Sequence, residues 1–369
     1  MSEGQENSAP QPAETKPLRL ALLASERTIY EYSIFLRHLL VGLADESIPV
    51  ALVCPADCDV DSVISGAVEV IRDPAFKLPL LRRQNRKRLI DRLEKFEPSV
   101  LHCLCQSKAA LAKQLAKQLD LHYILTVNSL RKQWQRLSIS SKRCSTITVP
   151  AESIADNIAK TNPHFAERIK RINIGAFAEE TIGCFSVPGR LTGMVIAGSP
   201  DNPAELENLF GALRHLAIDG YEFMLVLTGY GWTEGQLHKL LAAFGLSQMA
   251  VVVPELQPRR SILAAGDIFI QPRPSNSFNP LLLEAMSVGT VVAGCKGGVD
   301  DLIVDGQTCT VFDPDDELSI YNCLQRLFDT PDSARQLAGN AQQYIRENHT
   351  VSKMISSILR IYHDSLGFV

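Results

Sequence analysis

The stretch DIFIQPRPSNSFNPLLLEAMSVGTVVAGCKGG, residues 267–298, carries most of the information about the fold. It begins with an apolar run of strand length at 267–272 and passes through a loop rich in Pro, Ser and Asn. A helical pattern follows from Pro280 to Val288, then a second apolar run at 290–294, and the stretch ends in the pair Gly297-Gly298. A strand, a helix and a second strand in this order are typical of a βαβ unit, whose two strands lie parallel in one sheet.

The same alternation extends over the whole chain. Strand-length runs occur at 18–24, 49–55, 68–72, 99–104, 122–127, 145–150 and 171–175, with helical patterns such as Ile29–Leu43 between them. A second series starts after 183–193, with runs at 194–198, 222–229, 250–255, 267–272 and 290–294 and helices such as Ala204–Leu216. Helical stretches at 317–328, 333–348 and 351–365 close the chain without a further strand. The pattern predicts an α/β protein with two doubly wound, Rossmann-like domains.

Length and composition favour the same organisation. The 369 residues exceed one usual domain, and a net charge of −4 with a pI near 6.1 argues against nucleic acid as a default partner. No apolar run reaches the roughly 18 residues of a membrane span, and the polar N-terminus lacks the apolar core of a signal peptide, so we expect a cytoplasmic protein. The nine cysteines are expected to be free thiols, and no metal site is expected because neither close cysteine pair has a second ligand pair.

The loop and helix after 267–272 predict an anion site. Unpaired backbone N–H groups and the positive end of the helix dipole should face outward where the helix opens near Pro280. Glu284 lies one turn inside that helix among apolar neighbours, which favours a ligand role over a solvated carboxylate. Gly297-Gly298 is interpreted as a loop that allows close approach of a backbone to a ligand, with an ordinary turn as the alternative.

Residues 267–316 resemble the donor-site region of the GT-B glycosyltransferases of family 4 (glycosyl transferases group 1). Weaker matches at 98–104, 146–158, 171–180, 194–198 and 227–241 extend the resemblance from Leu18 to Leu366. It implies two Rossmann-like domains facing a cleft, with the last helix crossing back to the N-terminal domain. The expected parts are a disordered tail (1–17), an acceptor-side domain (18–185 with 350–369) and a nucleotide-sugar-binding domain (190–345).

The resemblance also implies roles for individual residues. Glu284 would accept hydrogen bonds from ribose hydroxyls, and Asn276 would contact the donor sugar. The donor diphosphate would be bound without a metal or other cofactor by the backbone of Phe278, Asn279, Pro280 and Leu281, with Gly297, Gly298, Gly198 and Ser199 close by.

The chain departs from the family pattern at several positions. Asn276 replaces the first glutamate of the E-x7-E motif, Ser199 stands where the family has a phosphate-binding Arg, and Ala204 stands near the position of its phosphate-binding Lys. On the acceptor side, Asn128 replaces a histidine, and the glycine-rich loop is replaced by Ser25, Glu26, Arg27 and Thr28. Two cations, Arg273 and Lys296, are candidates to compensate by reaching the phosphates, with solvated surface charges as the alternative.

Two weaker features concern the acceptor. The basic helix at 80–95 could contact an anionic membrane surface, although a solvated helix face is the favoured interpretation, and Trp134 lies among cations in a loop expected to border the cleft. His102 is interpreted as a hydrogen-bonded core histidine.

The sequence therefore predicts a glycosyltransferase that moves a hexose from a nucleotide-diphosphate sugar to a glycan, lipid or small acceptor, with retention of configuration. The main alternative is a catalytically degenerate relative that binds a nucleotide sugar or serves as a scaffold. A sugar-nucleotide epimerase would need acid and base pairs for which the sequence gives no support.

Overall fold

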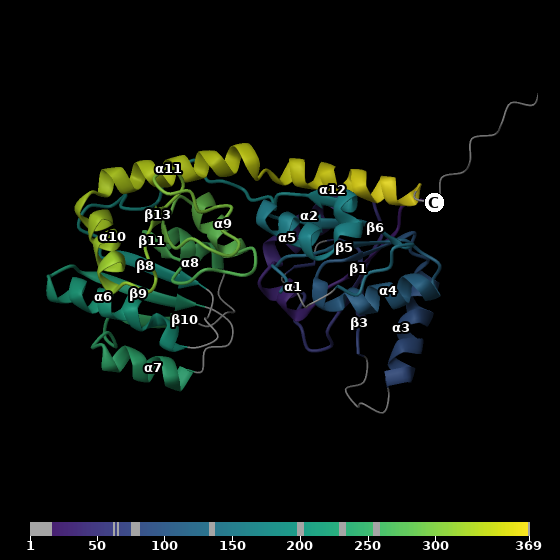
Figure 1. Cartoon of the computed structure of the whole chain (residues 1–369), viewed down its shortest axis with the longest axis horizontal. Coiled ribbons are helices and arrows are strands. Elements are labelled where there is room, and N and C mark those ends of the chain that lie inside the picture. Colours follow the sequence, from purple (N-terminus) through teal and green to yellow (C-terminus); the bar gives the residue numbers. More distant parts are fainter. Residues whose placement is uncertain are drawn as a thin grey trace, which may run out of the picture.

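The structure is a computed structural model of the chain. It describes residues 17–61, 63–64, 66–74, 82–132, 137–197, 203–228, 234–253 and 259–367. Two parallel sheets form two domains that lie side by side, and the helices α11 and α12 run along one side of both (Figure 1). The predicted α/β fold with two doubly wound domains is confirmed.

The N-terminal sheet contains seven parallel strands in the order β3-β2-β1-β4-β5-β6-β7. Their bounds are Leu20–Leu23 (β1), Val50–Cys54 (β2), Val68–Arg72 (β3), Val100–Cys103 (β4), Tyr123–Thr126 (β5), Cys144–Val149 (β6) and Ile169–Arg171 (β7). The helices are Glu26–Tyr30 (α1), Ser33–Asp45 (α2), Arg82–Phe96 (α3), Ala109–Gln118 (α4) and Glu152–Thr161 (α5), with 3-10 turns at Gln106–Lys108 (η2) and Pro163–Arg168 (η3). The strand order reverses between β1 and β4, which is where α/β sheets commonly bind ligands.

The C-terminal sheet has six parallel strands in the order β10-β9-β8-β11-β12-β13. They are Thr192–Ala197 (β8), Phe223–Thr228 (β9), Ala250–Val253 (β10), Ile268–Ile270 (β11), Val291–Gly294 (β12) and Thr310–Val311 (β13). The helices are Glu207–Ile218 (α6), Glu234–Ala243 (α7), Arg259–Ala265 (α8), Pro280–Ser287 (α9), Glu317–Asp329 (α10), Pro331–Asn348 (α11) and Val351–Leu366 (α12), with the 3-10 turn η4 at Pro203–Leu206. Here the order reverses between β8 and β11.

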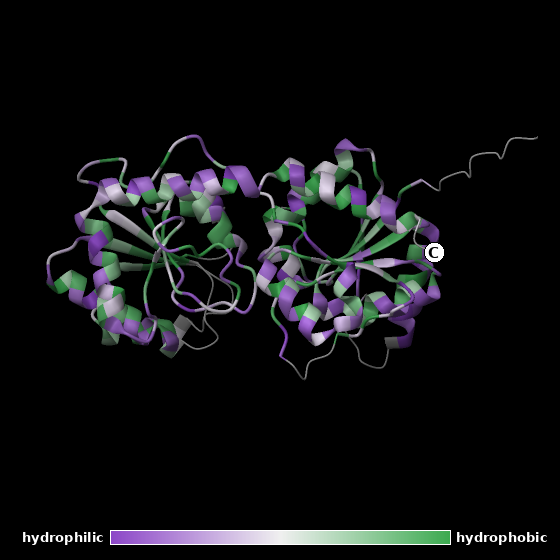
Figure 2. Ribbon diagram, turned by 45° about the horizontal axis from the view of Figure 1, so that its top comes forward, coloured by the Kyte–Doolittle hydropathy of each residue, from purple (hydrophilic) through white to green (hydrophobic). Residues whose placement is uncertain are grey.

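The two faces of the C-terminal sheet belong to different hydrophobic clusters. Val195, Phe269 and Val292 on one face pack with α9 and join the core of the N-terminal domain. Met194 and Ile268, on the opposite face of the same strands, pack with α6 and α10. Figure 2 shows the apolar strands inside each domain, between helices that combine polar and apolar residues. One apolar cluster thus runs from one domain into the other.

Helix α12 packs on the N-terminal domain although the helix before it packs on the C-terminal one. It contacts α2, β4 and β6, and Figure 1 shows it lying over that domain. Its buried face includes Met354, Ile358 and Tyr362. The Tyr362 hydroxyl lies 2.7 Å from Nδ1 of His102 on β4, and the Ser365 hydroxyl lies 2.9 Å from that of Ser145 on β6. The end of the chain therefore ties the two domains together.

Several elements differ from the sequence-based expectations. The helix expected at Ile29–Leu43 is two helices: a capping box of Ser25 and Thr28 starts α1 at Glu26, and a turn at Glu31 and Tyr32, where the Tyr32 backbone leaves the helical region (φ −101°, ψ 25°), separates it from α2. The strand expected at 171–175 is β7, which ends at Arg171, and the helix expected from Ala204 begins as the 3-10 turn η4. Strand β13 was not predicted because it is only two residues long. Within the described residues, no helix is both long and apolar enough to span a membrane.

Candidate functional site

The predicted donor segment lies at the carboxyl edge of the C-terminal sheet and faces the other domain. β11 ends at Ile270, the loop runs from Gln271 to Asn279, and α9 begins at Pro280. All eight residues of α9 are buried, because the helix packs against α8, α11 and β12. The packing of α9 therefore fixes the position of the residues that follow the loop.

The opening turn of α9 is capped by its own chain, which corrects the expectation of unpaired N–H groups. Oδ1 of Asn279 accepts hydrogen bonds from the backbone N–H groups of Leu281 (3.1 Å) and Leu282 (3.3 Å). Pro280 has no N–H, and the N–H of Phe278 donates to the carbonyl oxygen of Asn128 at 2.9 Å. An anion at this helix end would have to displace the Asn279 carboxamide.

Glu284 is 4 % exposed, so it is not the solvated carboxylate of the alternative interpretation. It lies one turn inside α9 on a helix without exposed faces. A buried carboxylate needs hydrogen-bond donors around it, since burial without them costs several kcal/mol. This burial is compatible with the predicted ligand role, which stays a prediction.

The glycine pair meets the donor loop directly. Gly297 (φ +111°) and Gly298 (φ +71°) both have positive φ, and Gly298 forms a bridge with Ser275. A Cβ atom at Gly298 would lie 2.1 Å from the carbonyl oxygen of Ser275, so only glycine fits there. The N–H of Gly297 donates to Oδ2 of Asp300 at 2.9 Å. The close approach predicted for this loop is thus an approach to its own chain.

The two candidate cations lie in different surroundings. The Arg273 guanidinium forms an ion pair with Asp315, and its Nε donates to the carbonyl oxygen of Glu205 at 2.9 Å. Glu205 is next to Ala204, near which the family resemblance would place a phosphate-binding Lys, so Arg273 lies beside that segment. Lys296 is exposed. One cation is neutralised by a carboxylate and the other is in solvent.

A cavity of about 350 Å³ lies at the reversal point of the N-terminal sheet. Its walls follow β1, β4 and β5, and a loop of the C-terminal domain adds one residue. They comprise Ser25, Glu26, Arg27, Thr28, Tyr32, Cys105, Gln106, Ser107, Asn128, Ser129 and Ser277. Most of these residues carry hydroxyl, amide or charged groups, although carbon atoms make up most of the surface that faces the cavity.

The acceptor-side candidates Ser25, Glu26, Arg27 and Asn128 all line this cavity. Ser25 is the N-cap of α1, so its hydroxyl is used in the helix. The Asn128 N–H donates to Oε1 of Gln106 at 3.0 Å, and its Nδ2 donates to the carbonyl oxygen of Leu104 at 3.2 Å. Asn128 is therefore fixed by the loop after β4.

Cys105 also lines the cavity, although the sequence shows it only as one of a close cysteine pair that lacks a second ligand pair for a metal. The hydrogen bond from the Cys103 thiol, with smaller contributions from the hydroxyls of Ser107, Ser25 and Thr28, outweighs burial and lowers the pKa of the Cys105 thiol to about 5. All nine cysteines are free, and the described residues contain no cluster of three possible metal ligands.

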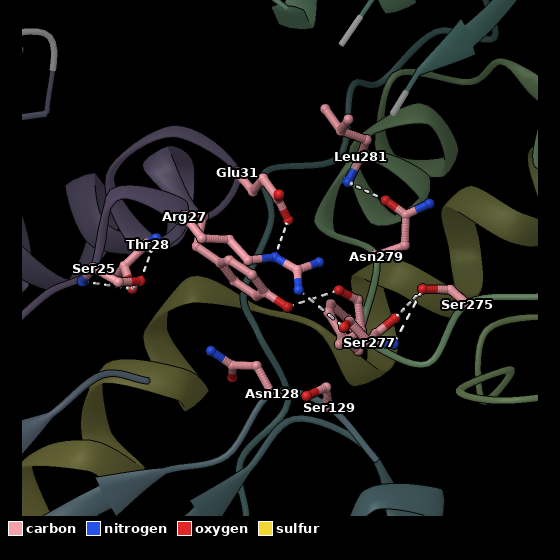
Figure 3. A network of polar contacts seen from close by, with 12 residues as sticks. Ser25, Arg27, Thr28, Glu31, Asn128, Ser129, Ser275, Ser277, Asn279 and Leu281 are labelled. Carbon is pink, nitrogen blue, oxygen red and sulfur yellow. Dashed lines mark hydrogen bonds and ion pairs between the residues drawn. The ribbon is translucent and has the colours of Figure 1, made fainter. Parts of the chain in front are cut away.

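The loops of the two domains pair across the cleft (Figure 3). Ser129 and Ser277 form an antiparallel bridge, and the Leu130 N–H donates to the carbonyl oxygen of Asn276 at 2.8 Å. The Asn276 side chain itself is exposed. Arg27 of α1 donates to the Ser277 hydroxyl at 3.2 Å and forms an ion pair with Glu31.

A second contact between the domains occurs at α5. Asp301 Oδ1 accepts hydrogen bonds from the N–H groups of Glu152 (2.6 Å) and Ser153 (3.4 Å), the first residues of the helix. Residue Ala151, which precedes the helix, provides no side-chain cap. A carboxylate of one domain thus caps a helix of the other.

Sequence reasoning did not single out several residues of this region. No sequence pattern indicates a role for Tyr32, Gln106, Ser277 and Asp301, because each forms its hydrogen bonds with residues far away in the chain. Three predicted residues, Gly198, Ser199 and Trp134, lie outside the described residues.

Comparison with known proteins links the C-terminal domain to a family. Residues 194–344 match the sequence model of "Glycosyl transferases group 1". The sulfoquinovosyl transferase SQD2 of Arabidopsis thaliana is 23 % identical over 269 residues, which cover 65 % of this chain and 51 % of the plant protein. The chain thus spans about half the length of that relative.

Solved structures match over nearly the full length. A sucrose-phosphate synthase from Thermosynechococcus elongatus superimposes with a TM-score of 0.75 at 16 % identity, covering 95 % of this chain and 99 % of that one. HepE from Anabaena, solved with UDP-glucose, gives a TM-score of 0.74 at 15 % identity, covering 94 % and 100 %. At these identities the likeness establishes the two-domain GT-B fold.

Proposed function

We propose that this chain is a group 1 glycosyltransferase of the family 4 type, which transfers a hexose from a nucleotide-diphosphate sugar to a glycan, lipid or small acceptor. The observation that carries the proposal is the buried Glu284 on α9, in a segment that matches the family model. Its carboxylate would accept the ribose hydroxyls. The UDP-glucose bound by HepE, which has a similar fold, supports a nucleotide-sugar donor.

The proposed reaction retains configuration and needs no metal. The leaving diphosphate would be stabilised by the opening of α9, with the loop of Gly297 and Gly298 and the cations Arg273 and Lys296 beside it. Asn276 would hydrogen-bond the sugar hydroxyls. The acceptor would occupy the N-terminal cavity, where a few hydroxyl and amide groups in a largely apolar lining could hydrogen-bond its hydroxyls.

The test is calorimetric titration with UDP, GDP and ADP. One of them should bind, and Glu284→Gln should weaken its affinity tenfold or more, since it removes a charge-assisted hydrogen bond. Thr290→Val is the control. It removes a different buried hydrogen bond, from the Thr290 hydroxyl to the Leu263 carbonyl oxygen (2.8 Å), at the amino end of β12. Equal affinity in wild type and folded Glu284→Gln would contradict the ribose role.

A catalytically degenerate donor-binding protein is the second candidate, and specific contacts favour it. The Asn279 side chain accepts hydrogen bonds from the backbone N–H groups at the opening of α9, and Asp315 forms an ion pair with Arg273. This candidate binds nucleotide but gives neither transfer nor donor hydrolysis. In an inactive wild type, the changes Ser199→Arg, Ala204→Lys and Asn276→Glu together should then restore hydrolysis, if the loss lies in the donor site alone.

The acceptor side would meet an anionic membrane if the acceptor is a lipid. Helix α3 presents exposed cations at Arg83, Lys87, Arg88 and Arg92. Co-sedimentation with vesicles containing anionic lipid should then fall when Lys87 and Arg92 are both changed to Glu. Binding that does not change would leave α3 as a solvated helix.

A further inference from the structure

The loop that should receive the donor is bonded to the other domain. Residues 276–278 pair with residues 128–130, and we call this contact the loop latch. Two backbone bonds define it, from the Leu130 N–H to the Asn276 oxygen (2.8 Å) and from the Phe278 N–H to the Asn128 oxygen (2.9 Å). Ser129 and Ser277 face each other between them. This is the pattern of a short antiparallel ladder made from two loops.

A buried side chain of the N-terminal domain also hydrogen-bonds the donor loop. Tyr32, 3 % exposed, donates its hydroxyl to the carbonyl oxygen of Phe278 at 2.7 Å. Burial raises the pKa of the Tyr32 phenol, so the hydroxyl stays protonated and remains a donor at neutral pH. Phe278 is itself 2 % exposed and lies in the shared apolar cluster. Figure 3 shows the neighbouring contact, in which Arg27 reaches Ser277, and Ser277 lines one side of the N-terminal cavity.

The loop latch uses groups that an anionic ligand would need. The Phe278 N–H is bonded across the cleft, and the N–H groups of Leu281 and Leu282 are bonded to Asn279. Beside Asn279, the Nε2 donor of Gln271 has no hydrogen-bond partner among the described residues, although Gln271 is 4 % exposed. A buried donor without a partner is costly, and a ligand oxygen would satisfy it.

We propose that the loop latch is an autoinhibitory contact that closes the donor site until the two loops separate. This inference rests on the proposed function, since it concerns access to the same site. The diphosphate can reach the Phe278 N–H only when the two loops separate. The apparent dissociation constant then equals the intrinsic one divided by the fraction of molecules with an open latch.

The first test weakens the loop latch by one hydroxyl group. Tyr32→Phe should increase the open fraction about three- to tenfold, the usual effect of one hydrogen bond. Hydrogen exchange of the peptides that contain Leu130 and Phe278 should accelerate, and nucleotide affinity should rise by the same factor. Tyr123→Phe is the matched control, because its hydroxyl bonds the Ser140 N–H at 2.9 Å away from the loop latch.

The second test locks the contact. Residues opposite one another in an antiparallel bridge have Cα atoms roughly 4.5–5.5 Å apart, within the range of a disulfide. The double variant Ser129→Cys/Ser277→Cys should therefore cross-link on oxidation. Oxidised protein should lose nucleotide binding, and reduction should restore it. Each single variant serves as a control for a bond to Cys105, which lines the same cavity.

The outcomes separate the two claims. Equal affinity of UDP, GDP or ADP for oxidised and reduced double variant overturns the autoinhibitory role while leaving the donor site standing. If no nucleotide binds to wild type or Tyr32→Phe, although exchange shows an opened latch in Tyr32→Phe, the donor site itself is refuted. The loop latch would then be a structural contact between the domains without a regulatory role.

Discussion

We expect the buried His102 to make the attachment of α12 sensitive to pH. It lies on β4 and is 2 % exposed, with Nδ1 2.7 Å from the Tyr362 hydroxyl and Nε2 2.7 Å from the Thr126 hydroxyl. Burial lowers the pKa of His102 to about 3. An unfolded histidine has a pKa of about 6.5, so between these values the unfolded chain takes up a proton that the folded protein refuses.

The sign and size of the effect follow from this difference. The contribution is complete above pH 6.5 and is lost as the pH falls, by about 1.4 kcal/mol for each pH unit. Between pH 6.5 and 4.5, His102 alone should thus lower the free energy of unfolding by about 2.5 kcal/mol.

Urea unfolding at pH 7.5, 6.0 and 4.5 measures this dependence. His102→Gln should be less stable at pH 7.5 but should lose less stability on acidification than wild type. Tyr362→Phe keeps the histidine, so it should cost about 1–3 kcal/mol at each pH and retain the wild-type slope. His38 and His349, whose pKa values burial also lowers, are present in all three proteins. Identical slopes for wild type and His102→Gln would refute the reasoning.

Three further changes test other parts of the structure. Gly298→Ala should destabilise the protein by about 2 kcal/mol or more in urea unfolding, because its Cβ would collide with the Ser275 oxygen; a neutral effect would contradict the fit of this loop. Asp301→Ala should cost about 1–2 kcal/mol, measured in the same way, by uncapping α5, and unchanged stability would show that the interdomain cap contributes nothing. In an active enzyme, Arg273→Ala should lower kcat far more than it weakens donor binding, because charge on the diphosphate develops in the transition state; unchanged kcat would remove Arg273 from the mechanism.

The sequence predicts the fold well because each signal is local. Alternating apolar runs and helical patterns are enough to identify both parallel sheets, and Pro280 correctly indicates the start of α9. The errors concern element boundaries and very short elements, which depend on local contacts that the apolar pattern does not show. A turn at Glu31 and Tyr32 splits one predicted helix, and the two residues of β13 are too few to form a pattern.

The candidate site is less predictable because its key contacts join residues far apart in the chain. Nothing near Tyr32 in sequence indicates that its hydroxyl meets the carbonyl of Phe278. The helix dipole at Pro280 suggested an anion site, whereas Asn279 fills the helix end with its own carboxamide. Asn279 precedes Pro280 as an N-cap residue would, so that cap was the one signal available in the sequence.

The most direct test of the proposed donor site is a crystal structure with whichever of UDP, GDP or ADP binds most tightly. We predict that the ribose hydroxyls hydrogen-bond the Glu284 carboxylate and that the diphosphate lies at the opening of α9. The bond between Phe278 and Asn128 should then be broken. A nucleotide bound elsewhere, or one bound with Glu284 out of reach and the loop latch intact, would contradict the account.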